Sequence, residues 1–155
     1  MYRIIILLTL SALSANSFIP SNGAEINYTQ VFFKWPQIPQ ANGYELKIFQ
    51  NGENEELFSG YSESNSLLVQ NILNWSESYV WEVCGVGSYS NSCHTQNYFM
   101  INSLPDYHPD EIHITSYNED YYQEGINILD FESLGYSVAI DEYGDVVWFA
   151  NKNNF

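Results

Sequence analysis

Short runs of alternating apolar and polar residues, each closed by a turn signal, fill the middle of this 155-residue chain and constrain its fold most. A β-strand places successive side chains on opposite faces, so a period of two predicts strands with one buried face. Three runs each put three apolar side chains on one face: Val31, Phe33 and Trp35; Tyr44, Leu46 and Ile48; and Tyr79, Trp81 and Val83. A further strand is expected over Leu67–Leu73 and a short edge strand over Phe18–Pro20. Strands this short, interrupted this regularly, predict an all-β sandwich.

The composition agrees with β structure and also sets the charge. The 13 Tyr, 9 Phe and 4 Trp favour pleated, half-buried surfaces. The 19 acidic residues against 4 basic ones give a net charge of −15. Such a chain repels phosphate backbones and anionic lipid, which argues against nucleic-acid binding and peripheral membrane attachment. The acidic residues could attract cations such as Ca²⁺ or simply keep the surface soluble, and their scattered positions favour the second interpretation.

Residues 1–15 are typical of a secretory signal peptide. Arg3 supplies a minimal charge, and an apolar run follows from Ile4 to Leu10. The run is too short to span a bilayer, which takes about 20 residues. Small residues follow it at Ser11, Ala12, Ser14 and Ala15. The sequence therefore predicts cleavage near residue 14 or 15, no membrane span, and a secreted, periplasmic or cell-surface protein, with a buried N-terminal strand as the alternative.

The two cysteines fit an oxidising compartment. Cys84 and Cys93 flank a stretch rich in Gly, Ser and Asn, which is the composition of a hairpin loop. A disulfide across that hairpin is the favoured interpretation. Strict alternation from the two flanking strands puts the side chains on opposite faces, so the bond requires a β-bulge. Two cysteines do not make a zinc site, which takes four ligands.

Residues 17–102 resemble a bacterial-type fibronectin III domain. The resemblance rests on Pro20–Ala24, Val31–Trp35, Ala41–Ile48, and Leu73 followed by Tyr79, Trp81 and Val83. It implies that Trp35 and Tyr44 pack in the core. It also implies that Leu73 and Tyr79 form a tyrosine corner, in which the hydroxyl ties down the connecting loop. Together with Leu46 and Trp81, which alternation places inward, these residues are expected to be structural.

The C-terminal third carries more apolar surface than three short strands can cover. Residues 103–110 read as a linker with two proline turns, and residues 111–155 contain a short strand at Glu111–Thr115 and a hairpin segment. Val146–Phe149 is continuously apolar, which suits a strand buried on both faces. Three strands in isolation still need a covered face. Either these strands pack on the sandwich, or the remainder of their domain lies elsewhere in the polypeptide.

Glu124–Leu129 and Tyr136–Phe149 are similar to the start of an arylsulfotransferase-type β-propeller. In that family an Ile-Asp pair, a glycine turn and a Val-Val-Trp strand make the first blade. The resemblance implies an incomplete first blade here, with a downstream propeller domain in the same polypeptide as its partner. The family's catalytic histidine lies in a region that no part of this chain matches. No catalytic residue and no cofactor are therefore predicted, and the three histidines receive no role.

Two groups of side chains contain possible metal ligands. His108 and His113 lie near Asp106, Asp110 and Glu111, but their spacing fits no zinc pattern, and a solvated linker is favoured. Asp141, Glu142 and Asp145 surround Gly144, but an EF-hand needs more ligands in register, and a hairpin turn is favoured. No metal site is predicted.

Two functions are compatible with these sequence features. The first is the N-terminal part of an exported arylsulfotransferase-like protein, which would be catalytically incomplete over these residues. The alternative is a small secreted fibronectin-III-like binding or adhesion module without catalytic activity. Aromatic residues expected at the surface, Trp75 and Phe49, favour the alternative.

Overall fold

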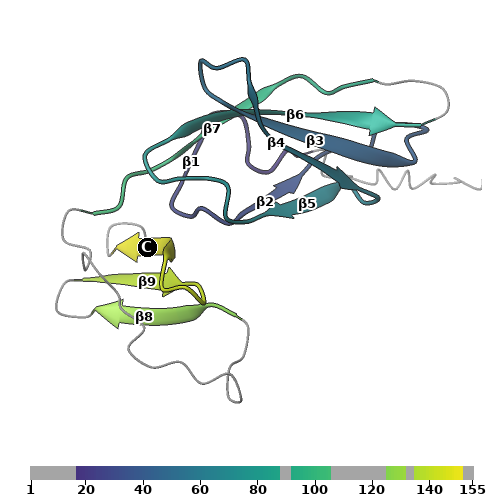
Figure 1. Ribbon diagram of the computed structural model, residues 1–155. Coiled ribbons are helices and arrows are strands. Elements are labelled where there is room, and N and C mark those ends of the chain that lie inside the picture. The colour runs from purple at the N-terminus through teal and green to yellow at the C-terminus, as the bar shows by residue number, and fades with distance from the viewer. Residues whose placement is uncertain (1–16, 88–91, 106–124, 132–134, 152–155) are drawn as a thin grey trace, which may run out of the picture.

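Every regular element that the structure describes is a β-strand (Figure 1). The computed structural model describes residues 17–87, 92–105, 125–131 and 135–151. The strands are β1 (Ala24–Ile26), β2 (Val31–Lys34), β3 (Gly43–Gln50), β4 (Glu56–Ser62), β5 (Ser66–Val69), β6 (Ser78–Val86), β7 (Asn97–Ile101), β8 (Asn127–Phe131), β9 (Tyr136–Ile140) and β10 (Val146–Asn151). The all-β prediction is confirmed for these residues. The expected signal peptide and the strand expected at residues 111–115 lie outside them.

Strands β1 to β7 form a sandwich-like pair of sheets. One sheet has the order β1-β7-β6-β3-β4, and the other consists of β2 and β5. Figure 1 shows the two-stranded sheet lying across the face of the larger one. A single cluster of buried side chains from both sheets fills the space between them. The hydrophobic gain from that burial is the main force holding the two sheets together.

The side chains that alternation places inward build this core. All six residues expected to be structural are buried: Trp35, Tyr44, Leu46, Leu73, Tyr79 and Trp81. The rings of Trp35 and Tyr44 meet edge to face, with centroids 5.5 Å apart. The Tyr79 hydroxyl accepts the backbone N–H of Asn74 at 2.8 Å. Burial raises the pKa of the Tyr79 phenol above its usual value, because the ionised form would lose its hydration.

Three segments of the sandwich differ from expectation. The strand expected over residues 67–73 is shorter and begins earlier, at Ser66–Val69. Strand β4 was not expected, and it pairs antiparallel with β3 along most of its length. The edge strand expected at residues 18–20 is reduced to one bridge, between Ile19 and Lys34.

The C-terminal strands form a separate three-stranded antiparallel sheet with the order β10-β9-β8. One of its faces is buried around Tyr136, Val138 and Phe149, with Trp75 and Leu104 packed against it. Its β9–β10 hairpin turns at residues 141–145, as predicted. The Asp141 carboxylate accepts the backbone N–H groups of Tyr143 and Asp145, both at 2.9 Å, and thereby stabilises the turn.

This sheet attaches to the sandwich through β10. The Phe149 N–H donates to the Asn27 carbonyl at 3.0 Å, and the Thr29 N–H donates to the Val147 carbonyl at 2.9 Å. These bonds flank an antiparallel bridge between Tyr28 and Trp148. The segment 27–29 therefore pairs with β10 on the side that β9 leaves open. The apolar surface expected to be in excess is therefore partly buried: Tyr136, Val138 and Phe149 are covered on one face, whereas Ile128 on the other face is 72% exposed within the described part of the chain.

Candidate functional site

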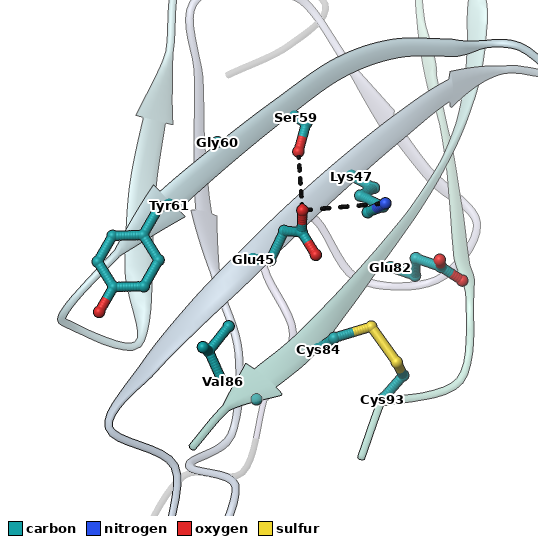
Figure 2. Close-up of a pocket in the computed structure, with 10 residues that line it drawn as sticks. Glu45, Lys47, Ser59, Gly60, Tyr61, Glu82, Cys84, Val86 and Cys93 are labelled. Carbon is teal, nitrogen blue, oxygen red and sulfur yellow. Dashed lines mark hydrogen bonds and ion pairs between the residues drawn. A yellow bond between two sulfur atoms is a disulfide. The ribbon is translucent and has the colours of Figure 1, made fainter. Parts of the chain in front are cut away.

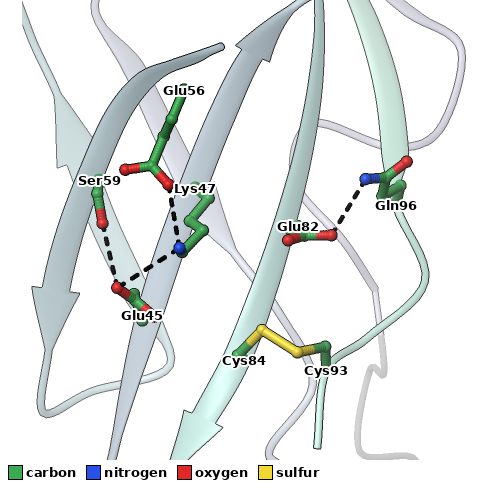
Figure 3. The surroundings of a disulfide bond; sticks show 8 residues. All are labelled: Glu45, Lys47, Glu56, Ser59, Glu82, Cys84, Cys93 and Gln96. Carbon is green, nitrogen blue, oxygen red and sulfur yellow. Dashed lines mark hydrogen bonds and ion pairs between the residues drawn. A yellow bond between two sulfur atoms is a disulfide. The ribbon is translucent and has the colours of Figure 1, made fainter. Parts of the chain in front are cut away.

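A first hollow of the described part lies on the outer face of β3, β4 and β6 (Figure 2). This hollow of about 580 Å³ is lined by charged and polar side chains, by Tyr61 and Val86, and by the two cysteines. Glu45, Lys47 and Glu82 project from neighbouring strands over the sheet (Figure 3). We call this surface the disulfide face.

The charged groups of the disulfide face are already engaged with one another. The Lys47 ammonium lies 3.0 Å from Glu56 and 3.9 Å from Glu45. The hydrogen bond to Glu56, and then the charge of Glu45, raise the pKa of Lys47 above its usual value. The Glu82 carboxylate accepts the Gln96 side-chain amide at 3.1 Å. The charges of this face are therefore paired within the face itself, and among its lining residues only Tyr61 and Val86 offer a large apolar side chain.

The disulfide between Cys84 and Cys93 forms, and a register shift explains how. In the β6–β7 ladder Trp81 lies opposite Asn97, whereas Cys84 bridges Cys93. Three steps along β6 therefore correspond to four on the partner segment, which is the extra residue of a β-bulge. The bulge brings the two side chains to one face, with the Cα atoms 3.9 Å apart.

Removing this disulfide is expected to destabilise the sandwich. The cross-link closes a loop with a sequence separation of 9, and the loss of that loop constraint costs about 2.5 kcal/mol of unfolding free energy. Urea denaturation of the Cys84→Ser/Cys93→Ser variant measures the loss. The parent protein in reducing agent should match the variant. A midpoint unchanged in both would show that the bond adds no stability.

The second hollow lies where the sandwich meets the C-terminal sheet, and we call it the seam groove. It has a volume of about 540 Å³ and is lined by Tyr28, Gln30, Leu68, Ile126, Ile128, Ala139, Val147 and Trp148. Seven of these eight residues are apolar or aromatic, and none carries a charge. Concave apolar sites at the junction of two units are common places for ligands.

Strand pairing explains why the floor of the seam groove is apolar. Ile128 lies opposite Ala139, Ala139 lies opposite Trp148, and Trp148 bridges Tyr28. Side chains of directly opposed residues share a face of the sheet. The four residues therefore form one row on the face of the C-terminal sheet opposite to that of Tyr136, Val138 and Phe149. Burial raises the pKa of the Tyr28 phenol above its usual value, because the ionised form would lose hydration there.

The sandwich supplies the other wall. Leu68 lies opposite Phe32 in the β2–β5 pair, and both point away from the core and are exposed. Beside them the Gln70 side-chain amide donates to the Gln30 carbonyl oxygen at 3.1 Å. The exposed fraction is 50% for Leu68, 53% for Ile126 and 72% for Ile128. The seam groove thus joins outward-facing apolar residues of two sheets into one surface.

The residues singled out from the sequence do not form this site. The six structural residues lie in the sandwich core, away from both hollows. Trp75, expected to be exposed, packs at the junction, where its indole N–H donates to the Val146 carbonyl at 3.0 Å. His94 lies 3.0 Å from the Pro36 carbonyl oxygen and makes an edge-to-face contact with Phe18. The metal ligands weighed at residues 106–113 lie outside the described residues.

Within residues 17–87, 92–105, 125–131 and 135–151, no group of three His, Cys, Asp or Glu side chains is placed to hold a metal ion. In the same residues no helix is long and apolar enough to cross a bilayer. Comparisons of the chain with protein-family models, with curated proteins and with solved structures found no match.

Proposed function

We propose that this chain is an exported binding module that holds its ligand in the seam groove. The observation that carries the proposal is the open apolar surface at the junction of two sheets, where Ile128 is 72% exposed beside Trp148 and Leu68. Contiguous exposed apolar surface costs solubility, and on a soluble protein it usually marks an interaction site. Aromatic residues such as Trp148 and Tyr28 are frequent anchors of binding energy.

Two further features support the proposal. The packing of Trp35 on Tyr44 and the hydrogen bond from the Asn74 N–H to the Tyr79 hydroxyl are what a fibronectin-III-like domain would show, and such sandwiches often present binding surfaces. The disulfide of Cys84 and Cys93 fits an exported protein, because such bonds persist in oxidising compartments.

Chemical-shift mapping with uncharged fragments tests this function. Indole and cyclohexanol are added to ¹⁵N-labelled protein, and we expect the largest shifts at Leu68, Ile126, Ile128 and Trp148. Ile128→Thr should weaken the response, while Leu57→Ser, which alters an exposed leucine on β4 away from the groove, should leave it unchanged. Shifts confined to the disulfide face, or no saturable shifts at all, would refute binding in the seam groove.

The arylsulfotransferase-type resemblance is a second proposal, favoured by one observation. The β8–β9–β10 meander with its Asp141–Asp145 turn has the form expected of a first propeller blade, and its exposed face is one that a neighbouring blade would cover. Sequencing the gene beyond the codon for Phe155 tests it. Several hundred further codons with hairpins at a blade period would support it, and an immediate stop codon would end it. The 155-residue chain alone is expected to transfer no sulfuryl group from a phenyl sulfate.

A further inference from the structure

The seam groove continues into a polar end with an acidic character. Gln30 and Ile126 line the groove and also line a third hollow of about 410 Å³. The remaining walls of that hollow are Gln70, Asn71, Gly125, Asp141, Glu142 and Tyr143. Its described lining therefore holds two carboxylates and three side-chain amides, and it contains no lysine or arginine.

This polar end is built on fixed elements. Asp141 is only 8% exposed, and its carboxylate accepts two backbone N–H groups of its own turn at 2.9 Å. On the opposite wall the Gln70–Gln30 hydrogen bond couples the ends of β5 and β2. A site held by packed, hydrogen-bonded supports keeps its shape before a ligand arrives, which lowers the entropy lost on binding.

We propose that the seam groove binds an extended polypeptide segment in which apolar side chains are followed by a lysine or arginine. This inference rests on the proposed binding function and names its ligand class. The apolar side chains would lie on the row of Ile128, Ala139 and Trp148. The cation would lie in the polar end near Asp141 and Glu142, and the amides of Gln30 and Gln70 would meet the peptide backbone.

The negative charge of the chain and of the groove favours a positively charged ligand. The chain carries a net charge of −15, and Asp141 and Glu142 add carboxylates at the polar end of the groove. Such a field attracts cations to the site and repels anions, which affects both the association rate and the choice of partner. A ligand with a carboxylate, sulfate or phosphate at this position is therefore disfavoured.

The apolar floor selects a peptide over a sugar. The groove does hold two aromatic side chains, Tyr28 and Trp148, but Leu68, Ile126 and Ile128 add aliphatic surface beside them, which offers the hydroxyl groups of a sugar no hydrogen bonds. Aliphatic surface is buried well by leucine, isoleucine or valine of a partner, at roughly 25 cal/mol per Å² removed from water. The extended form follows from the flat row of cross-strand residues, on which every second side chain of a strand-like ligand can rest.

Fluorescence anisotropy with two synthetic peptides tests the inference. The first peptide is fluorescein-labelled Leu-Thr-Leu-Thr-Leu-Lys-Lys, and the second replaces both lysines by glutamates. We expect saturable binding of the lysine peptide to the full chain and at least about 10-fold weaker binding of the glutamate peptide. Raising the salt concentration should reduce this difference, because it screens the charges.

Matched variants place the peptide in the groove. Ile128→Thr should weaken binding about 10-fold, because it removes most of an exposed aliphatic contact while keeping β-branching. Glu142→Gln should weaken binding of the lysine peptide about 3-fold and should not weaken binding of the glutamate peptide. The controls are Leu57→Ser and Glu53→Gln, which make the same kinds of change away from the groove and should alter neither affinity. Unchanged circular dichroism and melting temperature identify variants that fold normally.

These experiments distinguish a failure of the peptide inference from a failure of the proposed binding function. Equal binding of both peptides, or parent-like affinity in folded Ile128→Thr, would overturn the peptide inference. If cellohexaose or chitohexaose shifts Ile128 and Trp148 while the lysine peptide does not, the binding function stands and the ligand class is wrong. If neither these probes nor the uncharged fragments reach the groove, both proposals fail.

Discussion

Replacing Trp81 by alanine is expected to lower the free energy of unfolding of the sandwich by about 4 kcal/mol, the range of a fully buried tryptophan. Trp81 has no exposed surface. Its ring meets Phe33 and Phe18 edge to face, with centroids 5.1 and 5.7 Å away. Alanine leaves a cavity between the two sheets that the rigid strands cannot close. A domain with about 5–15 kcal/mol of total stability would be largely unfolded at modest urea concentrations.

The conservative variant Trp81→Phe separates packing from hydrogen bonding. The indole N–H of Trp81 is buried without a hydrogen-bond partner among the described residues, so phenylalanine removes no bond. We expect a loss of about 1 kcal/mol, because most ring contacts remain and an unsatisfied donor disappears. Urea denaturation followed by far-ultraviolet circular dichroism measures both variants. If the phenylalanine variant were as unstable as the alanine variant, the edge-to-face packing described here would not be the source of the stability.

The strands with strong alternation were predictable because their buried residues are large and regularly spaced. In β3 the inward residues are Tyr44, Leu46 and Ile48, and all three are buried. The turn at Asp141–Asp145 was equally predictable, because aspartate and glycine favour turns through their own local hydrogen bonding and backbone freedom. In these segments local sequence preference and tertiary packing agree.

Strand β4 was missed because its inward residues give a weak signal. Phe58, Gly60 and Ser62 face the core side, while Leu57 and Tyr61 face solvent. Gly60 is needed for close packing, since a Cβ there would lie 2.7 Å from the Phe58 ring. A glycine inside a strand pattern lowers its apparent β preference. The pairing with β3 therefore overrides a sequence that suggests a loop.

The seam groove was not predictable because its residues are distant in sequence. Leu68, Ile128 and Trp148 come together only when β10 pairs with the segment 27–29. Periodicity identifies the buried face of each strand, but it does not say which outward-facing apolar residues will meet. One signal was present, since Phe32 stands between the inward Val31 and Phe33 and breaks the alternation on the solvent side. An outward apolar residue of that kind marks a surface to examine.

Replacing Trp75 by alanine is expected to loosen the C-terminal sheet without unfolding the sandwich. Trp75 packs against the cores on both sides of the junction. Its indole N–H donates to the Val146 carbonyl at 3.0 Å, and its ring lies 5.5 Å from that of Phe149. Loss of these contacts should lower the local opening free energy of β9 and β10 by about 3 kcal/mol. Amide hydrogen exchange should then be roughly 100-fold faster in those strands, while the amides of β3 and β6 keep their protection.

Trp75→Phe is the matched control, because it keeps the ring contact with Phe149 and removes only the hydrogen bond. We expect that change to lower the local opening free energy of β9 and β10 by about 1 kcal/mol, which corresponds to roughly 5-fold faster amide exchange. The same variants also test whether ligand binding depends on the attachment of the C-terminal sheet to the sandwich, because the seam groove has walls from both. Trp75→Ala should weaken any groove ligand even though Trp75 does not line the groove. If Trp75→Ala kept parent-like exchange in β9 and β10, the backbone bonds to Asn27 and Thr29 alone would hold the C-terminal sheet. If it lost protection throughout β3 and β6, the sandwich and the C-terminal sheet would unfold as one unit.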